Sequence, residues 1–154
     1  MDPFDLIAAI PLLPLMAFLI ILFAGQFTPS LLPKRGAIPG IIALSGSLLI
    51  SLSLILPVYS GDFLNKSAYL WAKWAVSDLH FGFLIDPLSA LMLVIVSLIA
   101  LLVFIHSLGY MNDQNEQGLF RYYAGLSLFS FSMLSFVISD NLLMSFIFFE
   151  LIGF

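Results

Sequence analysis

Residues 88–108 read "LSALMLVIVSLIALLVFIHSL", and this stretch decides the fold class. It contains no Asp, Glu, Lys or Arg, and most of its side chains are aliphatic. A helix needs about 20 mostly apolar residues to cross the roughly 30 Å hydrocarbon layer of a membrane. The stretch therefore predicts a transmembrane helix.

Three further windows meet the same criterion of length and polarity: Leu6–Gly25, Ala37–Pro57 and Phe120–Ser139. A fifth window, 141–154, has only 14 residues, and a helix of that length covers about 21 Å. We expect an all-α polytopic membrane protein, a single membrane domain over residues 1–154. It would have four complete transmembrane helices and a partial fifth.

Both ends of the sequence carry expectations about the native chain. An incomplete helix would leave backbone carbonyls unpaired inside lipid, so we expect a native chain that is longer than these residues. The start, "MDPFDL", carries two acids and no Lys or Arg before the first apolar run. A cleavable signal peptide begins with a basic region, so we expect the first helix to be retained.

The composition agrees with a membrane protein and excludes several other classes. Hydrophobic residues make up 62% of the chain and charged residues 9%, whereas an ordinary soluble domain has roughly 25% charged residues. The net charge of −4 provides no basic surface for nucleic acid. The chain contains no cysteine, which excludes disulfides and thiolate metal sites.

The link between the second and third windows differs from the other connections. It includes "YLWAKWAVSDLHFGFLID", residues 69–86, where two β-prone runs flank a short turn at "VSD". This pattern favours a β-hairpin at the membrane surface, where Tyr69, Trp71 and Trp74 would suit the headgroup region. An irregular amphipathic loop is the alternative.

Small residues recur at helical spacing inside the windows. Ala43, Ser47 and Ser51 are four residues apart and share one face of the second helix. In lipid, such a stripe allows two helices to approach closely, so we expect it to face another helix. The fourth helix carries a similar trace of serines: Ser127, Ser130 and Ser135.

The basic residues indicate an orientation. With the N-terminus outside, Lys34, Arg35 and Arg121 lie on the cytoplasmic side, where basic residues are enriched in membrane proteins. Lys66 and Lys73 would then lie outside. We therefore expect an outer or periplasmic N-terminus.

Most of the polar residues near helix ends have structural explanations. Asp86 can accept hydrogen bonds from the first free N–H groups of the third helix, and Pro87 suits the first helical position. Asp140 or Asn141 can cap the fifth helix in the same way. His106 lies near the end of the third helix, where a cation would meet the negative end of the helix dipole; a proton relay is the alternative.

Glu150 has no such explanation. It lies nine residues after Asn141, about 13 Å along a helix and therefore close to the membrane midplane. A carboxylate at that depth costs at least about 2.5 kcal/mol. We expect Glu150 to face protein or water, and either to stay protonated or to pair with a cation. A proton-carrying site and a structural interhelical hydrogen bond are its two candidate roles.

Residues 81–154 resemble a known family. The elements "IDPLS", "GYM" and "FSFSM", followed by "SDNLL" and Glu150, are similar in order and spacing to the N-terminal part of chain 5 (subunit L) of respiratory complex I. That chain is an antiporter-like membrane subunit of NADH:quinone oxidoreductase. The two N-terminal helices match only in their hydrophobic layout.

The resemblance implies a function, a site and partners. It implies a subunit that couples quinone reduction to proton pumping, in which Glu150 is a key proton-site residue. It also implies partner subunits of complex I that carry NADH, FMN and iron–sulfur clusters. The implied location is an energy-transducing membrane, either a bacterial plasma membrane or the inner membrane of an organelle. Within this chain, no metal site and no cofactor site is expected.

Sister subunits with a similar helix and acid occur in multisubunit Na⁺/H⁺ antiporters and membrane-bound hydrogenases. They provide the second hypothesis for the function. A truncated membrane protein with a scaffold or assembly role is the third.

Overall fold

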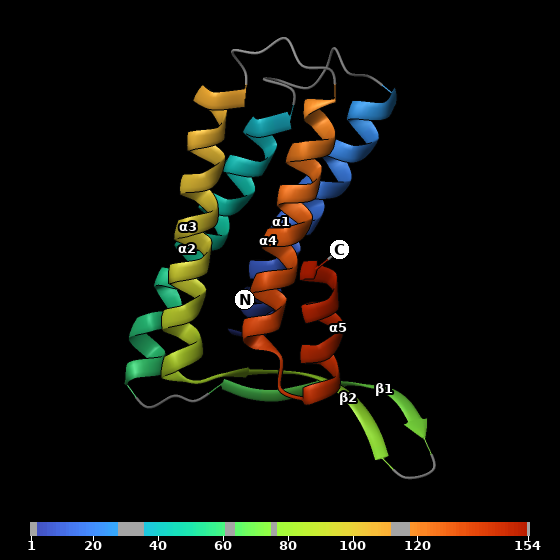
Figure 1. Ribbon diagram of the computed structural model, residues 1–154. Coiled ribbons are helices and arrows are strands. Elements are labelled where there is room, and N and C mark those ends of the chain that lie inside the picture. The colour runs from blue at the N-terminus through green and yellow to red at the C-terminus, as the bar shows by residue number, and fades with distance from the viewer. Residues whose placement is uncertain (1–2, 28–35, 61–63, 75–76, 112–117, 154) are drawn as a thin grey trace.

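A computed structural model describes residues 3–27, 36–60, 64–74, 77–111 and 118–153, and it shows a helical bundle with one hairpin. Figure 1 labels the elements in chain order. They are α1 (Pro3–Phe27), α2 (Ala37–Tyr59), β1 (Leu64–Trp74), β2 (Ser77–Ile85), α3 (Pro87–Met111), α4 (Leu119–Ile138) and α5 (Leu142–Gly153).

The helices begin and end within three residues of the windows read from the sequence. Within the described chain, three helices are long and apolar enough to cross a membrane: Leu6–Phe27 of α1, α2 and α3. The expected count of four complete spans is therefore not reproduced. Helix α4 has the length, but it carries Arg121, two tyrosines and several serines, which lower its hydropathy.

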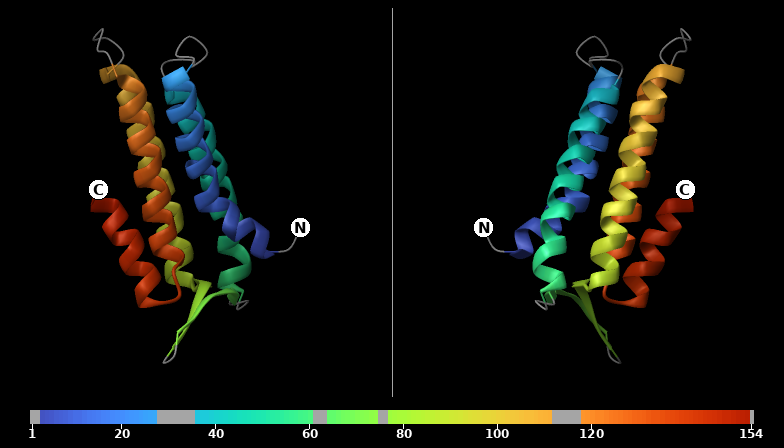
Figure 2. Two further views of the ribbon diagram at one scale, coloured as in Figure 1. Left: turned by 90° about the vertical axis from the view of Figure 1, so that its right-hand side faces the viewer. Right: turned by 90° about the vertical axis from the view of Figure 1, so that its left-hand side faces the viewer.

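The first four helices form a ring in which consecutive members run in opposite directions (Figure 1). Helix α1 packs against α2 and α4, and α3 packs against the same two helices. Helix α5 lies outside this ring against α4, as both side views show (Figure 2). The hairpin, the start of α3 and the turn before α5 share one end of the bundle.

The two strands after α2 pair with each other in antiparallel register, from Leu64 opposite Ile85 to Trp74 opposite Ser77. The register shifts twice along the pair. Phe83 of β2 also forms an isolated bridge with Ser139, in the turn between α4 and α5. The side chains of Tyr69, Trp71 and Trp74, expected in the headgroup region, lie outside the described residues, as do Lys34, Arg35, Lys66 and Lys73.

The core has two apolar clusters with a layer of serines between them. One cluster lies toward the hairpin and includes Ile10, Leu93 and Leu134; the other lies toward the opposite end and includes Ile21, Phe104 and Tyr123. The buried serines between the clusters come from three helices: Ser47, Ser51, Ser97, Ser127, Ser130 and Ser132. Each hydroxyl donates to a backbone carbonyl of its own helix, so none remains an unpaired donor in the core.

The stripe on α2 faces α1, which confirms the expectation of close helix packing. Ser47 is fully buried, and its Oγ lies 2.7 Å from the carbonyl oxygen of Ile10 in α1. Pro14 follows Ile10 by four residues and has no N–H to donate to that carbonyl. The serine hydroxyl therefore supplies the donor that the proline removes.

Glycines allow two further close approaches between helices. A Cβ atom on Gly40 of α2 would overlap the ring of Phe104 in α3, and one on Gly25 of α1 would overlap the ring of Phe120 in α4. At both places an aromatic ring lies directly on the backbone of the neighbouring helix. These contacts hold α2 to α3 and α1 to α4 at short distance.

Helix α3 begins at the hairpin, directly after β2. Asp86 Oδ1 accepts a hydrogen bond of 2.6 Å from the backbone N–H of Ser89, and Pro87 occupies the first helical position. Hydrogen bonds from Ser89, through its hydroxyl and then its N–H, hold the pKa of Asp86 below the ordinary aspartate value. The carboxylate is thus a cap of α3 that connects the hairpin to the bundle.

The contact between Ser47 and Ile10 predicts a loss of stability when its hydroxyl is removed. Ser47→Ala leaves the carbonyl of Ile10 without its donor, and we expect a loss of about 1 kcal/mol. Ser53→Ala is the matched control, because Ser53 is exposed on the same helix and bonds only to Ile50 of its own helix. Thermal unfolding in detergent measures both, and equal midpoints for the two variants would contradict the proposed contact.

The cap at Asp86 predicts a loss that depends on pH. Asp86→Ala should destabilise the protein by about 1 kcal/mol at neutral pH. Because the folded-state pKa is lowered, this contribution exists above the unfolded-state pKa and disappears as the pH falls through the folded-state value. Unfolding midpoints across an acid series should therefore converge with wild type, and Asp86→Asn should retain part of the cap. A difference that persists in strong acid would exclude the charged cap.

Candidate functional site

Glu150 lies on α5 beside the middle of α4. The ring of Phe148 packs edge-on against Phe131 at a centroid distance of 5.7 Å, and Phe149 lies 6.3 Å from Phe136. Phe131 lies in the middle third of the 20-residue α4. Since Phe148 is level with it, Glu150 lies near half the length of the bundle, far from either end. The contacts thus place Glu150 about half way along the bundle.

The carboxyl group points away from the four-helix ring. Glu150 is exposed, and the residue of α5 that is buried is Met144. Large apolar side chains are also exposed on this helix: Leu142, Leu143, Phe146, Ile147 and Phe149. Within the described chain, the acid therefore belongs to an open, apolar face.

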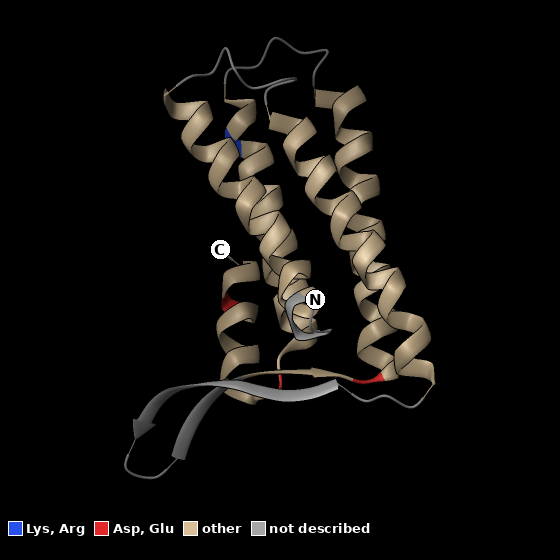
Figure 3. Ribbon diagram, turned by 180° about the vertical axis from the view of Figure 1, so that it is seen from behind, with Lys and Arg blue, Asp and Glu red and all other residues tan. Residues whose placement is uncertain are grey.

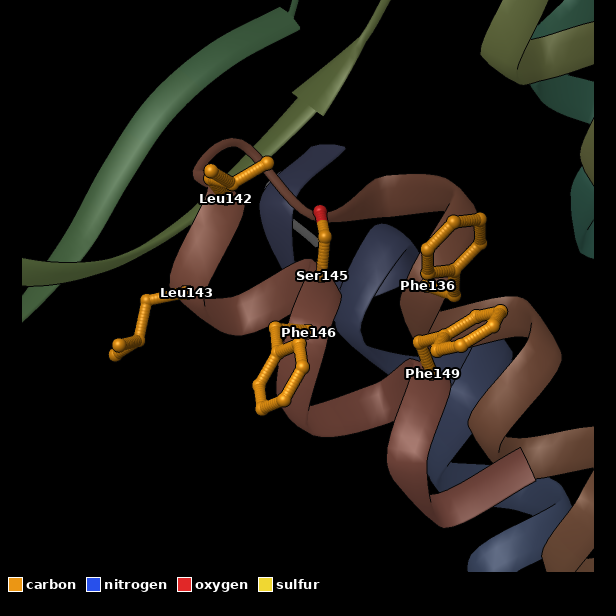
Figure 4. A pocket seen from close by; sticks show the side chains of 6 residues that line it. All are labelled: Phe136, Leu142, Leu143, Ser145, Phe146 and Phe149. Carbon is orange, nitrogen blue, oxygen red and sulfur yellow. The ribbon is translucent and has the colours of Figure 1, made fainter. Parts of the chain in front are cut away.

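An apolar groove lies between α4 and α5 next to this face. Its volume is about 620 Å³. Figure 4 shows the side chains that line it: Phe136, Leu142, Leu143, Ser145, Phe146 and Phe149. Phe149, the neighbour of Glu150 in sequence, forms one end of the lining. The acid is thus next to a surface that favours apolar contacts.

The cap of α5 is Asn141, the alternative to Asp140 that the sequence left open. Asn141 Oδ1 accepts a 2.8 Å hydrogen bond from the backbone N–H of Met144. Asp140 lies one residue earlier, and its Oδ1 accepts a 3.0 Å hydrogen bond from Asn141 Nδ2. Its other carboxylate oxygen lies against the backbone of Gly82 in β2. Asp140 therefore joins the turn to the hairpin, and Asn141 accepts the bond that was expected of Asp140.

The other candidate residues lie apart from Glu150. His106 is exposed on α3, which does not border α5 in the helix packing (Figure 1). The structure therefore does not bring His106 and Glu150 together. Asp86 and Asp140 lie at the hairpin end, whereas Arg121 lies in the first turn of α4 at the opposite end (Figure 3). No group of three or more His, Asp or Glu that could hold a metal occurs among the described residues.

Two features of the site were not identified in the sequence. The contact between Asp140 and Gly82 joins residues that lie far apart in the chain, and no local pattern announces it. The hydroxyls of Ser139 and Ser145 lie 2.5 Å apart and join the end of α4 to the first turns of α5. Ser139 and Ser145 are six residues apart on either side of a turn, so no helical periodicity predicts that they meet.

Comparisons with known proteins agree with the resemblance seen in the sequence. Residues 71–123 match the family described as NADH-ubiquinone oxidoreductase (complex I), chain 5 N-terminus. The chain is 36% identical over 150 residues to NAD(P)H-quinone oxidoreductase subunit 5 of the chloroplasts of Lemna minor, and equally so to that of Agrostis stolonifera. Each alignment covers 94% of this chain and 20% of the relative. The chain thus spans about one fifth of the length of these relatives.

A solved structure has the same fold. A chain of the membrane-bound sulfane sulfur reductase, an archaeal respiratory membrane complex, superimposes with a TM-score of 0.73 at 17% identity. The match covers 96% of this chain and 28% of the other. The helical bundle therefore occurs within a respiratory membrane complex. By its sequence, the chain is similar to the N-terminal region of complex I chain 5, through the family match at residues 71–123 and through relatives that align over 94% of its length.

Proposed function

We propose that this chain is part of a proton-translocating membrane subunit of an NAD(P)H:quinone oxidoreductase, and that Glu150 is its proton site. The observation that carries the proposal is a carboxyl group at half the height of an apolar bundle, on a helix that is otherwise free of charge. The names of the relatives support the reaction class.

The position of Glu150 favours a proton role over a structural one. A carboxyl group near the centre of the membrane is costly and persists where it has a function. Every buried serine hydroxyl described above is paired within the bundle, so the bundle itself does not require the acid as an acceptor. Glu150 instead faces outward, where another membrane segment or water would meet it. Such surroundings can alternate between those that favour the neutral acid and those that favour the carboxylate.

The redox chemistry is assigned to partner subunits. We place NADH, FMN and the iron–sulfur clusters there, because the chain has no cysteine with which to bind a cluster. This chain would contribute one proton-binding group within the membrane. Its partners would be the other membrane subunits of the complex, and those beside the open face of α5 would contact Glu150.

A second candidate function has a specific observation in its favour. The fold is shared with a chain of a sulfane sulfur reductase, a respiratory complex whose name includes no quinone. The chain could therefore serve as the corresponding subunit of another ion-translocating complex, such as an antiporter or a hydrogenase. Purification from the native membrane separates the two: NADH-oxidising flavin and iron–sulfur subunits should accompany the first, and their absence would favour the second.

The arrangement in the membrane is part of the proposal. We place the N-terminus, the hairpin, Asp86 and Asp140 on the outer side, and Arg121 on the inner side, following the preference of basic residues for the cytoplasm. We also infer that α4 crosses the membrane, since it lies alongside α1 and α3 over its length (Figure 2). Its serines and Tyr123 are buried against neighbouring helices and do not meet lipid.

The proton role predicts a selective loss of pumping. Glu150→Gln keeps the shape and hydrogen-bonding capacity of the side chain but cannot ionise, so the complex should assemble and lose most of its proton pumping per NADH oxidised. Glu150→Asp, which retains the acid, is the matched control and should keep part of the activity. Pumping is followed in membrane vesicles with a pH-sensitive dye. A normal ratio of protons to NADH in the glutamine variant would refute the role.

The orientation predicts which positions a membrane-impermeant thiol reagent can reach. Residues 1–154 contain no cysteine, so Ser60→Cys and Tyr110→Cys each add one thiol to this region, at opposite ends of the bundle, and labelling is read against the unmodified protein. In intact cells, Ser60→Cys should be labelled and Tyr110→Cys should be protected until the membrane is opened. The reverse pattern would invert the proposed orientation, and labelling of both would contradict a spanning α3.

A further inference from the structure

The geometry points to strand β2 as a positioning element for α5, acting through the turn that contains Ser139 and Asp140. We propose that Asp140 and Gly82 hold this turn in place and thereby set the position of the helix that carries Glu150. The positioning of α5 by this turn does not depend on the function of the protein. Its consequence for proton transport rests on the function proposed above.

The first observation is the close contact between Asp140 and Gly82. Gly82 is buried in β2, and a Cβ atom added to it would overlap the carboxylate of Asp140. A residue larger than glycine at this place would therefore displace the turn. The glycine allows the carboxylate to lie directly on the strand backbone.

The second observation is a continuous set of contacts from the strand to α5. Phe83, next to Gly82, forms a backbone bridge with Ser139. The hydroxyl of Ser139 lies 2.5 Å from that of Ser145, and Ser145 also donates to the carbonyl of Asn141 at 3.0 Å. Successive contacts through Ser139 and Ser145 thus connect the strand to the first turns of α5.

The third observation is that α5 has little other support in the described chain. It packs along α4 on one side, with Met144 as its buried residue, and its opposite side is exposed. A helix held along one side can tilt about its attached end. The contacts at its N-terminus, together with the ring contacts of Phe148 and Phe149, therefore set where Glu150 lies relative to α4.

Strand β2 also connects to the rest of the bundle at its last residue. Ile85 is buried in the same cluster as Ile138, and Asp86 caps α3 directly after it. The strand is therefore fixed to α3 on one side and to the α4–α5 turn on the other.

A disulfide reporter tests the structural part. Residues 1–154 contain no cysteine of their own, and Ser139→Cys with Ser145→Cys replaces the two hydroxyls that lie 2.5 Å apart, a separation suited to a disulfide. With Gly82 intact, mild oxidation of the complex in its membrane should form this bond. Adding Gly82→Ala should displace the turn and slow formation about fivefold. Gly125→Ala is the matched control, because its Cβ would meet no atom within 4 Å.

A relief variant keeps the test informative if Gly82→Ala prevents assembly. Asp140→Ala removes the carboxylate without adding an atom to the strand, and it should slow the disulfide in the same direction. In combination with Gly82→Ala, it should restore assembly, because the overlapping carboxylate is gone. An unchanged disulfide rate in Asp140→Ala, or in an assembled Gly82→Ala complex, would overturn the proposal.

The functional part is read from pumping in the same membranes, without the reporter cysteines. Gly82→Ala should reduce the number of protons pumped per NADH while NADH oxidation continues, and Gly125→Ala should not. If the disulfide slows but pumping stays normal while Glu150→Gln pumps poorly, the proposed function stands and the coupling of β2 to Glu150 fails. If Glu150→Gln itself pumps normally, the proposed function fails, and the disulfide result alone decides the structural part.

Discussion

The arrangement of the bundle depends on one requirement: inside a membrane, every backbone carbonyl needs a donor from the protein. Pro14 removes the N–H that would serve Ile10, at half the length of α1. Ser47 of α2 supplies the donor, at 2.7 Å, and can do so because the small residues beside it let the two helices approach. The proline of α1 and the small residues of α2 therefore act together: the first frees a carbonyl and the second allow a serine to bond to it.

The four-helix ring pairs its polar groups internally, and α5 lies outside this ring. In the ring of four helices, the hydroxyls of the serines between the two apolar clusters donate to backbone carbonyls, and the rings of Phe104 and Phe120 lie on glycines of the facing helices. The ring is complete as a packed unit of the described chain. Helix α5 lies outside it and exposes both its large apolar side chains and its acid. Its polar contacts are concentrated in the turn at its N-terminus.

The sequence predicted the helices well, because length and hydropathy in a membrane depend on local composition. It also placed the stripe of Ala43, Ser47 and Ser51 against another helix, since small residues gain nothing from contact with lipid. It could not identify Ile10 as the partner of Ser47, although Pro14 marks the free carbonyl. The choice of Asn141 over Asp140 as the cap followed from the tertiary contact with Gly82, which draws the aspartate away. Such pairings are set by packing and leave no local pattern.

The depth of Glu150 could be counted from its helix, but its surroundings could not, because they depend on which face of α5 meets α4. Met144 and Phe148 take up that face, and the carboxyl group is left on the open one. An acid that served only to join α5 to α4 would lie on the packed side, where Phe131 and Phe136 lie. In the proposed role, the group that balances its charge or exchanges its proton would therefore approach from outside the four-helix ring.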